Sequence, residues 1–159
     1  MSYVSDDIEH PFVVIDLQRL RSIDVDAEGR TAWVQAGATV GEVYYNVFNK
    51  TNGNAGFSAG ICPTLGVGGH ISVGGIGAIM RKFGVAADNV VDAKVVGIDG
   101  RVLDRSGMGE DLFWAIRGGG ASFGVIVAYK LQLVDVPPIV TTFSIYRNLS
   151  QNATQLVTR

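Results

Sequence analysis

The chain has 159 residues, of which 47% are hydrophobic and 18% charged, a composition typical of one globular domain and not of a disordered segment. Its formal net charge is −2 and its basic residues are scattered, which excludes an obvious nucleic-acid-binding surface. A single cysteine excludes an internal disulfide framework. The first residues, MSYVSDDIEH, are polar and acidic, so we expect no signal peptide in the chain as it stands.

The first predicted elements are short strands. Phe12–Asp16 (FVVID) is an uninterrupted apolar run closed by an aspartate, which predicts a buried strand. Ile23–Val25 and Thr31–Gln35 predict two further strands on either side of a turn that contains Gly29.

The clearest predicted helix begins after Thr39. Thr39 is a good N-cap residue, and Glu42 stands three residues further on, which is the spacing of a capping box. Apolar residues follow at positions i, i+3, i+4, i+7 and i+8 and predict one buried helix face. These residues are Val40, Val43, Tyr44, Val47 and Phe48. The turn residues Asn52–Asn54 predict the end of this helix.

The second half of the chain contains more strands than helices. The pair Asp99-Gly100 is a two-residue hairpin signal, and Gly118 is a plausible stop for a helix before it. Strands with few helices between them indicate an α+β arrangement. The predicted elements are a helical turn at Ala78–Phe83, hairpin strands at Ala93–Ile98 and Val102–Asp104, a helix at Glu110–Arg117 and a long strand at Phe123–Val134.

The most informative segment is Gly60–Gly77, GICPTLGVGGHISVGGIG. Between Thr51 and Met80 there is no Lys, Arg, Asp or Glu, and nine of the 21 glycines lie there. Glycine allows the backbone to approach a ligand closely, and bare N–H groups can hold an anion. Cys62, the single cysteine, lies inside this segment, so we expect a ligand cradle with a thiol beside it. Because interior glycines weaken helices, we do not expect this segment to span a membrane.

Several common motifs are absent. Gly66-x-Gly68 and Gly75-x-Gly77 both lack the third glycine of the Rossmann fingerprint. The sequence contains neither a G-x-x-x-x-G-K-[ST] phosphate loop nor a G-x-S-x-G nucleophile elbow. One cysteine and two distant histidines give no metal-ligand spacing, so no metal site is predicted.

Two longer motifs point to a family. C-P-T-x-G-x-G-G-H spans residues 62–70, and G-E-D-L-F-W-A-I-R-G-G-G spans residues 109–120. On these motifs the chain resembles the berberine bridge enzyme family, plant-type flavoproteins with the PCMH-type FAD-binding fold of vanillyl-alcohol oxidase. The resemblance covers essentially the whole chain and implies an α+β fold of strands with short packed helices. It implies an incomplete FAD-binding domain over residues 1–138 and the start of a missing substrate domain over residues 139–159.

The resemblance implies an FAD-dependent oxidoreductase that transfers hydride from an alcohol, carbohydrate or alkaloid-like substrate to a covalently bound flavin. Cys62 matches the cysteine whose sulfur bonds to C6 of the flavin ring, which requires a thiolate beside an electron-poor ring. The alternative for a lone cysteine is a small buried apolar residue. His70 is expected to orient its neighbours rather than to act as acid or base. The implied FAD contacts are Cys62, Thr64, Leu65, Gly66, Gly68, Gly69, His70, Gly74, Gly75, Gly77, Asn89, Gly124 and Val125.

Leu65 stands three residues after Cys62. In the family, valine at this position accompanies oxidases and leucine or isoleucine accompanies dehydrogenases, because one extra methylene narrows the path for dioxygen. The resemblance therefore favours a dehydrogenase with another electron acceptor. The alternative is that Leu65 only packs against its neighbours.

The chain also departs from the family. The histidine motif R-S-G-G-H-x-x-E-G-x-S, which carries a second covalent attachment, has no counterpart here, and His10 does not match it. The family's catalytic base lies in the substrate domain, so no catalytic residue is assigned. One interpretation is part of a secreted plant oxidoreductase, and the other is a truncated, inactive FAD-binding fragment. A binding module for a ligand other than flavin is a third class.

Three N-x-[ST] sequons, at Asn49, Asn148 and Asn152, fit a secreted, glycosylated parent protein. The expected partner is a small-molecule substrate, and the sequence predicts no oligomeric state.

Overall fold

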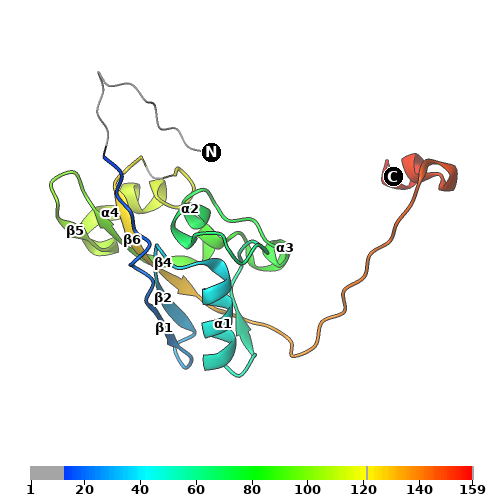
Figure 1. Ribbon diagram of the computed structural model, residues 1–159, viewed down its shortest axis with the longest axis horizontal. Coiled ribbons are helices and arrows are strands. Elements are labelled where there is room, and N and C mark those ends of the chain that lie inside the picture. The colour runs from blue at the N-terminus through cyan, green and yellow to red at the C-terminus, as the bar shows by residue number, and fades with distance from the viewer. Residues whose placement is uncertain (1–12, 121, 159) are drawn as a thin grey trace, which may run out of the picture.

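The centre of the molecule is a five-stranded antiparallel sheet in the order β1-β2-β6-β4-β5 (Figure 1). The computed structural model describes residues 13–120 and 122–158. A separate two-stranded sheet pairs β3 with β7. The strands are β1 Ile23–Asp26, β2 Thr31–Gln35, β3 Ala55–Gly56, β4 Val90–Val96, β5 Val102–Leu103, β6 Val125–Gln132 and β7 Val134–Asp135.

Helices from three parts of the chain pack on one face of the large sheet and bury a single apolar cluster with it. This arrangement of antiparallel strands and separate helices confirms the predicted α+β class. The helices are α1 Val40–Lys50, α2 Val67–Ser72, α3 Met80–Phe83, α4 Arg105–Ala115 and α5 Ala153–Val157, with 3₁₀ turns η1 Ala86–Asn89 and η2 Leu149–Gln151.

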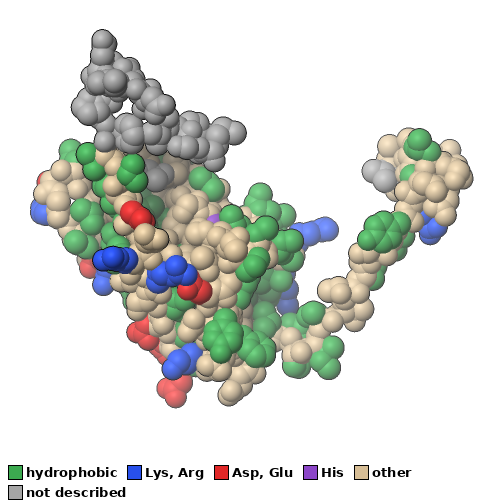
Figure 2. Space-filling model, viewed as in Figure 1, with side chains coloured by type: hydrophobic (Ala, Val, Ile, Leu, Met, Phe, Trp, Pro, Cys, Tyr) green, Lys and Arg blue, Asp and Glu red, His purple; other side chains and the backbone are tan. Residues whose placement is uncertain are grey.

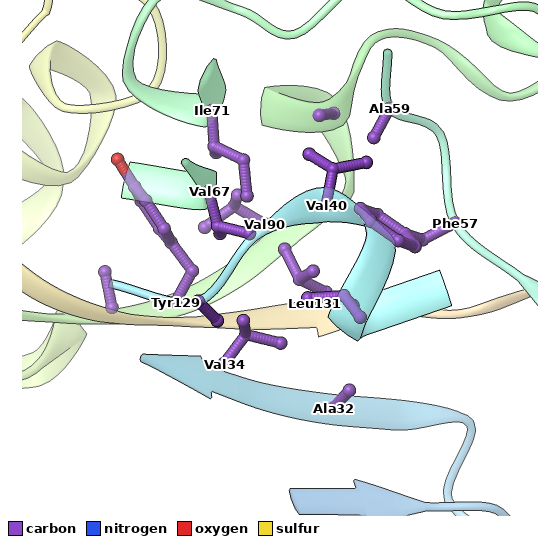
Figure 3. Packing of buried hydrophobic residues seen from close by; sticks show 14 of the residues in the cluster. Ala32, Val34, Val40, Phe57, Ala59, Val67, Ile71, Val90, Tyr129 and Leu131 are labelled. Carbon is purple, nitrogen blue, oxygen red and sulfur yellow. The ribbon is translucent and has the colours of Figure 1, made fainter. Parts of the chain in front are cut away.

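Tyr129 of β6 is the largest fully buried side chain in the core. It lies opposite Val34 on one neighbouring strand and Ala93 on the other. Figure 3 shows Tyr129 and Leu131 on the side of β6 that faces α1 and α2. The Tyr129 hydroxyl donates to the Ile116 carbonyl at 3.4 Å, and burial raises the pKa of Tyr129. Burying an apolar side chain of this kind stabilises the fold by about 1.5–3 kcal/mol, so this face holds the sheet and helices together.

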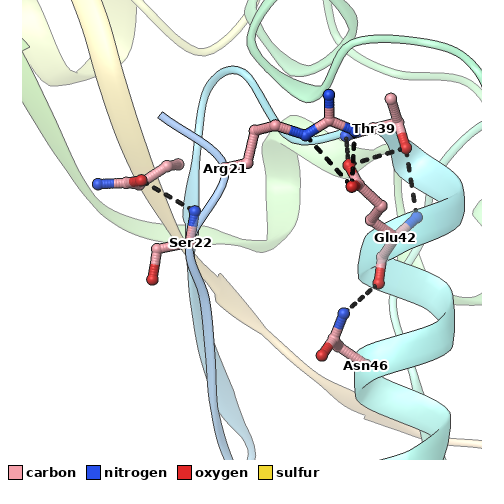
Figure 4. Close-up of polar contacts among 6 residues, drawn as sticks. Arg21, Ser22, Thr39, Glu42 and Asn46 are labelled. Carbon is pink, nitrogen blue, oxygen red and sulfur yellow. Dashed lines mark hydrogen bonds and ion pairs between the residues drawn. The ribbon is translucent and has the colours of Figure 1, made fainter. Parts of the chain in front are cut away.

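The helix predicted after Thr39 is confirmed as α1. The capping box is complete, because the Glu42 amide donates to Thr39 Oγ1 at 3.4 Å and the Thr39 amide donates to Glu42 Oε2 at 2.8 Å (Figure 4). Phe48 does not join the buried stripe and is 66% exposed. Its ring instead lies against Gly53 in the turn that follows the helix, where an added Cβ would come within 2.8 Å of the ring.

The strand predicted at residues 12–16 is wrong for the residues that the structure describes, and Phe12 lies outside them. Residues 13–16 form no strand, and Val13 and Val14 are 87% and 71% exposed. The apolar pattern is present, but a strand also needs a neighbour for its backbone hydrogen bonds. No strand among the described residues pairs with this segment.

The hairpin between β4 and β5 is confirmed with a longer loop than predicted. The Gly97 amide donates to the Arg101 carbonyl at 3.0 Å, so residues 98–100 form the loop and Gly100 takes a φ of +77°. Helix α4 begins five residues before the predicted start, because Asp104 accepts from the Gly107 amide at 2.8 Å and caps an extra turn. Gly109, with φ +75°, separates this turn from the predicted helix.

After β7 the chain leaves the body of the molecule and ends in η2 and α5 (Figure 1). Residues 139–147 are exposed throughout. A domain boundary at residues 138–139 stays a prediction. Within the described parts of the chain, no helix has the length and apolar character needed to cross a bilayer.

Candidate functional site

The glycine-rich segment runs from β3 through an exposed turn at residues 62–65 into α2. Helix α2 was missed in the sequence because Gly68 and Gly69 lie within it, and glycine lowers helix propensity by about 1 kcal/mol per residue. Val67 and Ile71, one turn apart, are both fully buried. Tertiary packing of this apolar pair therefore outweighs the local preference against helix.

Cys62 is exposed at the start of the turn. This position excludes the alternative of a small residue buried in the core. The first turn of α1 holds the thiol-bearing turn through backbone hydrogen bonds, because the first amides of a helix have no partner inside it. The Val40 amide donates to the Leu65 carbonyl at 2.8 Å and the Gly41 amide to the Pro63 carbonyl at 3.0 Å. A Cβ on Gly41 would lie 2.8 Å from the Pro63 Cβ, so glycine is needed for this close contact.

Gly60, two residues before the cysteine, is held on both sides. Its amide donates to His70 Nε2 at 2.8 Å, and its carbonyl accepts from the Tyr44 hydroxyl at 3.1 Å. Tyr44 also donates to the Ala59 carbonyl at 2.8 Å. Burial lowers the pKa of His70, and a neutral ring that accepts at Nε2 carries its proton on Nδ1. The structure thus gives His70 an orienting contact.

Tyr44 was not among the predicted site residues. The apolar pattern of α1 predicts that the Tyr44 ring is buried, but it assigns no hydrogen-bond partner to the hydroxyl. A tyrosine on a buried helix face needs a hydrogen-bond partner for its hydroxyl, so its presence there indicates a contact with a neighbouring segment.

The glycines of the segment fall into two groups. A Cβ on Gly77 would overlap the Ala59 carbonyl, and one on Gly68 would lie 3.0 Å from the Ala36 Cβ, so packing within the chain requires both glycines. A Cβ on Gly66 or Gly69 would meet nothing within 4 Å. These two positions form a bare surface that the fold of the described residues does not itself need. Such a surface suits close approach by a ligand.

Several predicted residues meet around one hollow of about 260 Å³. Gly68 and Gly69 of α2 line it together with Gly124 and Val125 at the start of β6. These pairs lie more than 50 residues apart in the sequence and are brought together because α2 packs against β6. The turn that carries Cys62, Thr64 and Leu65 is exposed and leads directly into α2.

Asn89, Gly74 and Gly75 serve the loop between α2 and η1. The Asn89 amide donates to the Phe83 and Val85 carbonyls, both at 2.9 Å, so both of its hydrogens are used within the chain. The carbonyls of Gly74 and Gly75 accept from the amides of residues 87 and 86 at 2.9 Å. Gly74 and Gly75 take φ of +106° and +76°, which the loop requires. Across residues 13–120 and 122–158, no group of three His, Cys, Asp or Glu side chains could hold a metal.

Comparison with known proteins decides the family. A family model described as an FAD binding domain matches residues 1–106. The chain belongs to the FAD-binding, berberine bridge enzyme-like family. Its fold is the PCMH-type FAD-binding fold, as the resemblance implied.

Relatives in this family are plant enzymes. Tetrahydroberberine oxidase of Berberis wilsoniae is 58% identical over 158 residues, and the match covers 99% of this chain and 29% of that protein. Monolignol oxidoreductase AtBBE-like 13 of Arabidopsis thaliana is 56% identical over 158 residues, with the same two coverages. The solved berberine bridge enzyme of Eschscholzia californica has a TM-score of 0.81 and 52% identity, over 86% of this chain and 27% of that one. The chain thus spans about 29% of the length of the curated relatives that it matches.

The residues present fit one side of an FAD. The bare surface at Gly66 and Gly69 leaves room for a flat or extended group against the backbone, and the segment has no charged side chain to exclude one. The exposed Cys62 thiol lies on the turn that leads into this surface. The Val67 and Gly68 amides donate to the Ala38 and Ala36 carbonyls at 2.8 and 3.1 Å, so these two are already used within the chain and are not free for phosphate oxygens.

Proposed function

We propose that this chain supplies the cysteine-bearing side of the FAD site of an oxidoreductase. FAD bound there would accept two electrons as hydride from the substrate. The observation that carries the proposal is an exposed thiol, Cys62, held on a fixed turn beside the bare positions Gly66 and Gly69. Hydrogen bonds from α1 hold this turn, and His70 holds the segment before it.

The substrate class in this proposal is a small alcohol, carbohydrate or alkaloid-like molecule. The names of relatives support each member of this range, because they include a tetrahydroberberine oxidase and a monolignol oxidoreductase. The solved relative Phl p 4.0202 is a glucose dehydrogenase. Leu65, which is 39% exposed on the thiol-bearing turn, supports a dehydrogenase that uses an acceptor other than dioxygen.

Covalent attachment through Cys62 is part of the proposal. An S–C bond from Cys62 to C6 of a bound flavin would replace the thiol hydrogen and one ring hydrogen. Dioxygen would take up the two electrons and two protons released and leave as hydrogen peroxide. The proposal includes no second, histidyl attachment and no catalytic base among residues 1–159, and His10 lies outside the residues that the structure describes. We place the beginning of the substrate domain at residues 139–159. The asparagines of the three sequons, Asn49, Asn148 and Asn152, are exposed, which supports a secreted, glycosylated protein, although Thr51 of the first sequon is buried.

The test is whether FAD becomes covalently attached to the chain. The chain is incubated with FAD and oxygen, denatured in acid and examined by absorbance and mass spectrometry. We expect the protein to keep yellow colour with the added mass of FAD, and Cys62→Ser to lose both while it still binds FAD reversibly. Colour kept by Cys62→Ser would overturn the cysteinyl bond, and absence of any FAD binding by the native sequence would overturn the proposed function.

A second measurement concerns turnover. The flavin-loaded chain is mixed with tetrahydroberberine, a monolignol or glucose, with either a redox dye or dioxygen as acceptor. Reduction of the dye by one substrate supports a competent dehydrogenase. Flavin binding without turnover of any substrate supports the inactive-fragment interpretation instead.

A further inference from the structure

We propose that Tyr44 is a positioning residue that fixes the segment carrying Cys62. The inference rests on the proposed function for its purpose, because a fixed thiol matters only if a cofactor is attached there. The hydrogen bonding of the Tyr44 hydroxyl to the Ala59 and Gly60 carbonyls does not depend on that function and has a test of its own.

The hydroxyl of Tyr44 contacts two neighbouring carbonyl oxygens, which share its one hydrogen. It lies 2.8 Å from the Ala59 carbonyl and 3.1 Å from the Gly60 carbonyl. Both Ala59 and Gly60 are buried. Within the described parts of the chain no other donor reaches these two oxygens. Removal of the hydroxyl would therefore leave buried carbonyls without a donor, which is costly in a folded protein.

The ring of Tyr44 has a separate role from its hydroxyl. It packs against the Phe57 ring with centroids 4.9 Å apart. Burial raises the pKa of Tyr44, so the hydroxyl keeps its proton and remains a donor over the physiological range. A phenylalanine would keep the ring contact and lose only the donor. The effects of packing and of positioning can thus be separated by a single substitution.

The contact matters because of where Gly60 lies. Its amide is bound to His70 and its carbonyl to Tyr44, so the peptide groups on both sides of its Cα are fixed. Cys62 follows two residues later, and the turn beyond it is bound to α1. Tyr44 lies one turn along the same helix. Helix α1 thus binds the chain on both sides of Cys62, through Tyr44 before it and through the first amides of the helix after it. Small displacements of a reacting group cost large factors in rate, so this fixation would serve attachment.

The experiment compares Tyr44→Phe with Tyr45→Phe. Tyr45 is the next residue of α1 and is 69% exposed, and its hydroxyl makes no hydrogen bond among the described residues, so Tyr45→Phe serves as the matched control. Amide hydrogen exchange of peptides covering residues 57–66 is followed by mass spectrometry in the full chain without FAD. We expect exchange about tenfold faster in Tyr44→Phe and unchanged in Tyr45→Phe. Equal exchange in the two variants would overturn the proposal.

A second readout separates positioning from general stability. At saturating FAD we expect Tyr44→Phe to attach flavin about tenfold more slowly than Tyr45→Phe, with an unchanged dissociation constant for reversibly bound FAD. Equal rates of attachment would overturn the role toward Cys62. If the native chain attaches no flavin at all, the covalent part of the proposed function fails, and the exchange measurement alone still decides whether Tyr44 fixes the segment.

Discussion

At the scale of single residues, the glycines of one sequence motif do different work. Gly77 and Gly68 are required by neighbours inside the chain, whereas Gly66 and Gly69 face open space. The sequence shows only that glycines cluster, because a glycine has no side chain by which its reason can be recognised. The neighbours that distinguish the two groups, such as Ala59 and Ala36, are not adjacent to these glycines in the sequence.

This division predicts opposite outcomes for two matched substitutions. Gly77→Ala should destabilise the protein by about 1–3 kcal/mol, because the new Cβ overlaps a backbone carbonyl that has no side-chain freedom to move away. Gly69→Ala should leave stability unchanged or raise it by up to about 1 kcal/mol, because alanine favours helix and meets nothing.

Thermal unfolding and FAD titration measure the two effects. Gly69→Ala is expected to weaken FAD binding while it folds normally. A stable Gly77→Ala variant would contradict the packing explanation. Unchanged FAD affinity in Gly69→Ala would show that this bare surface is not the cradle.

His70 predicts a pH dependence of stability. Burial lowers its pKa below the ordinary value of 6.5, so the folded state binds its proton less readily than the unfolded state. The stabilisation is complete above about pH 6.5 and is lost as the pH falls through the lowered pKa of the folded protein. Protonation also removes the Nε2 acceptor for the Gly60 amide. Urea unfolding between pH 5 and 8 should show this loss, and His70→Gln should flatten it. The same slope in His70→Gln would assign the effect to another group.

At the scale of elements, α1 is the support for the site. Its exposed side carries an ion pair between Arg21 and Glu42 at 2.6 Å, and its first turn is fixed by the capping box with Thr39 (Figure 4). The hydrogen bond from the Thr39 amide is the main cause that lowers the pKa of Glu42, and Arg21 adds to it. The Val40 and Gly41 amides, which bind the thiol-bearing turn, lie between the two amides of the capping box.

We therefore predict that Thr39→Ala lowers the free energy of unfolding by about 1 kcal/mol through loss of the cap. Arg21→Ala removes only a solvent-exposed ion pair and should cost less than about half of that amount. Chemical denaturation of both variants at pH 7 provides the comparison. An equal or larger loss in Arg21→Ala would mean that the ion pair, and not the cap, holds the start of α1.

The elements also show what sequence patterns can predict. The capping box and the β1–β2 pair depend on residues within a few positions of each other, and both were predicted with correct bounds to within one residue. Helix α2 and the two contacts of Gly60 depend on packing between distant segments, so local propensity gave no sign of them. The strand predicted at residues 12–16 was wrong for residues 13–16 for a related reason, because an apolar run does not reveal whether a pairing strand lies beside it. The cysteine motif was found from its length and specificity, and its attachment chemistry stays a prediction.

At the scale of the whole molecule, large apolar side chains remain exposed in several places, among them two groups of side chains. One is the glycine-rich side, where Ile61, Val73 and Ile76 are 80%, 67% and 68% exposed, and the other is the segment after β7, where Phe143 is 80% exposed. Figure 2 shows hydrophobic side chains gathered around α3 and again along the C-terminal segment.

The body of the molecule is predicted to fold without its last segment. Deletion of residues 139–159 should change the free energy of unfolding by less than about 0.5 kcal/mol, because residues 139–147 are exposed and bury nothing against the sheets. Deletion from residue 133 onward is the matched control. It removes Leu133, which is 3% exposed, and the β3–β7 pair that precedes the thiol-bearing turn, so it should destabilise the protein by about 2–5 kcal/mol. Urea unfolding of both truncated chains decides the matter. A large loss in the shorter deletion would place residues 139–159 in the same cooperative unit as the sheets and would overturn the boundary proposed at residues 138–139.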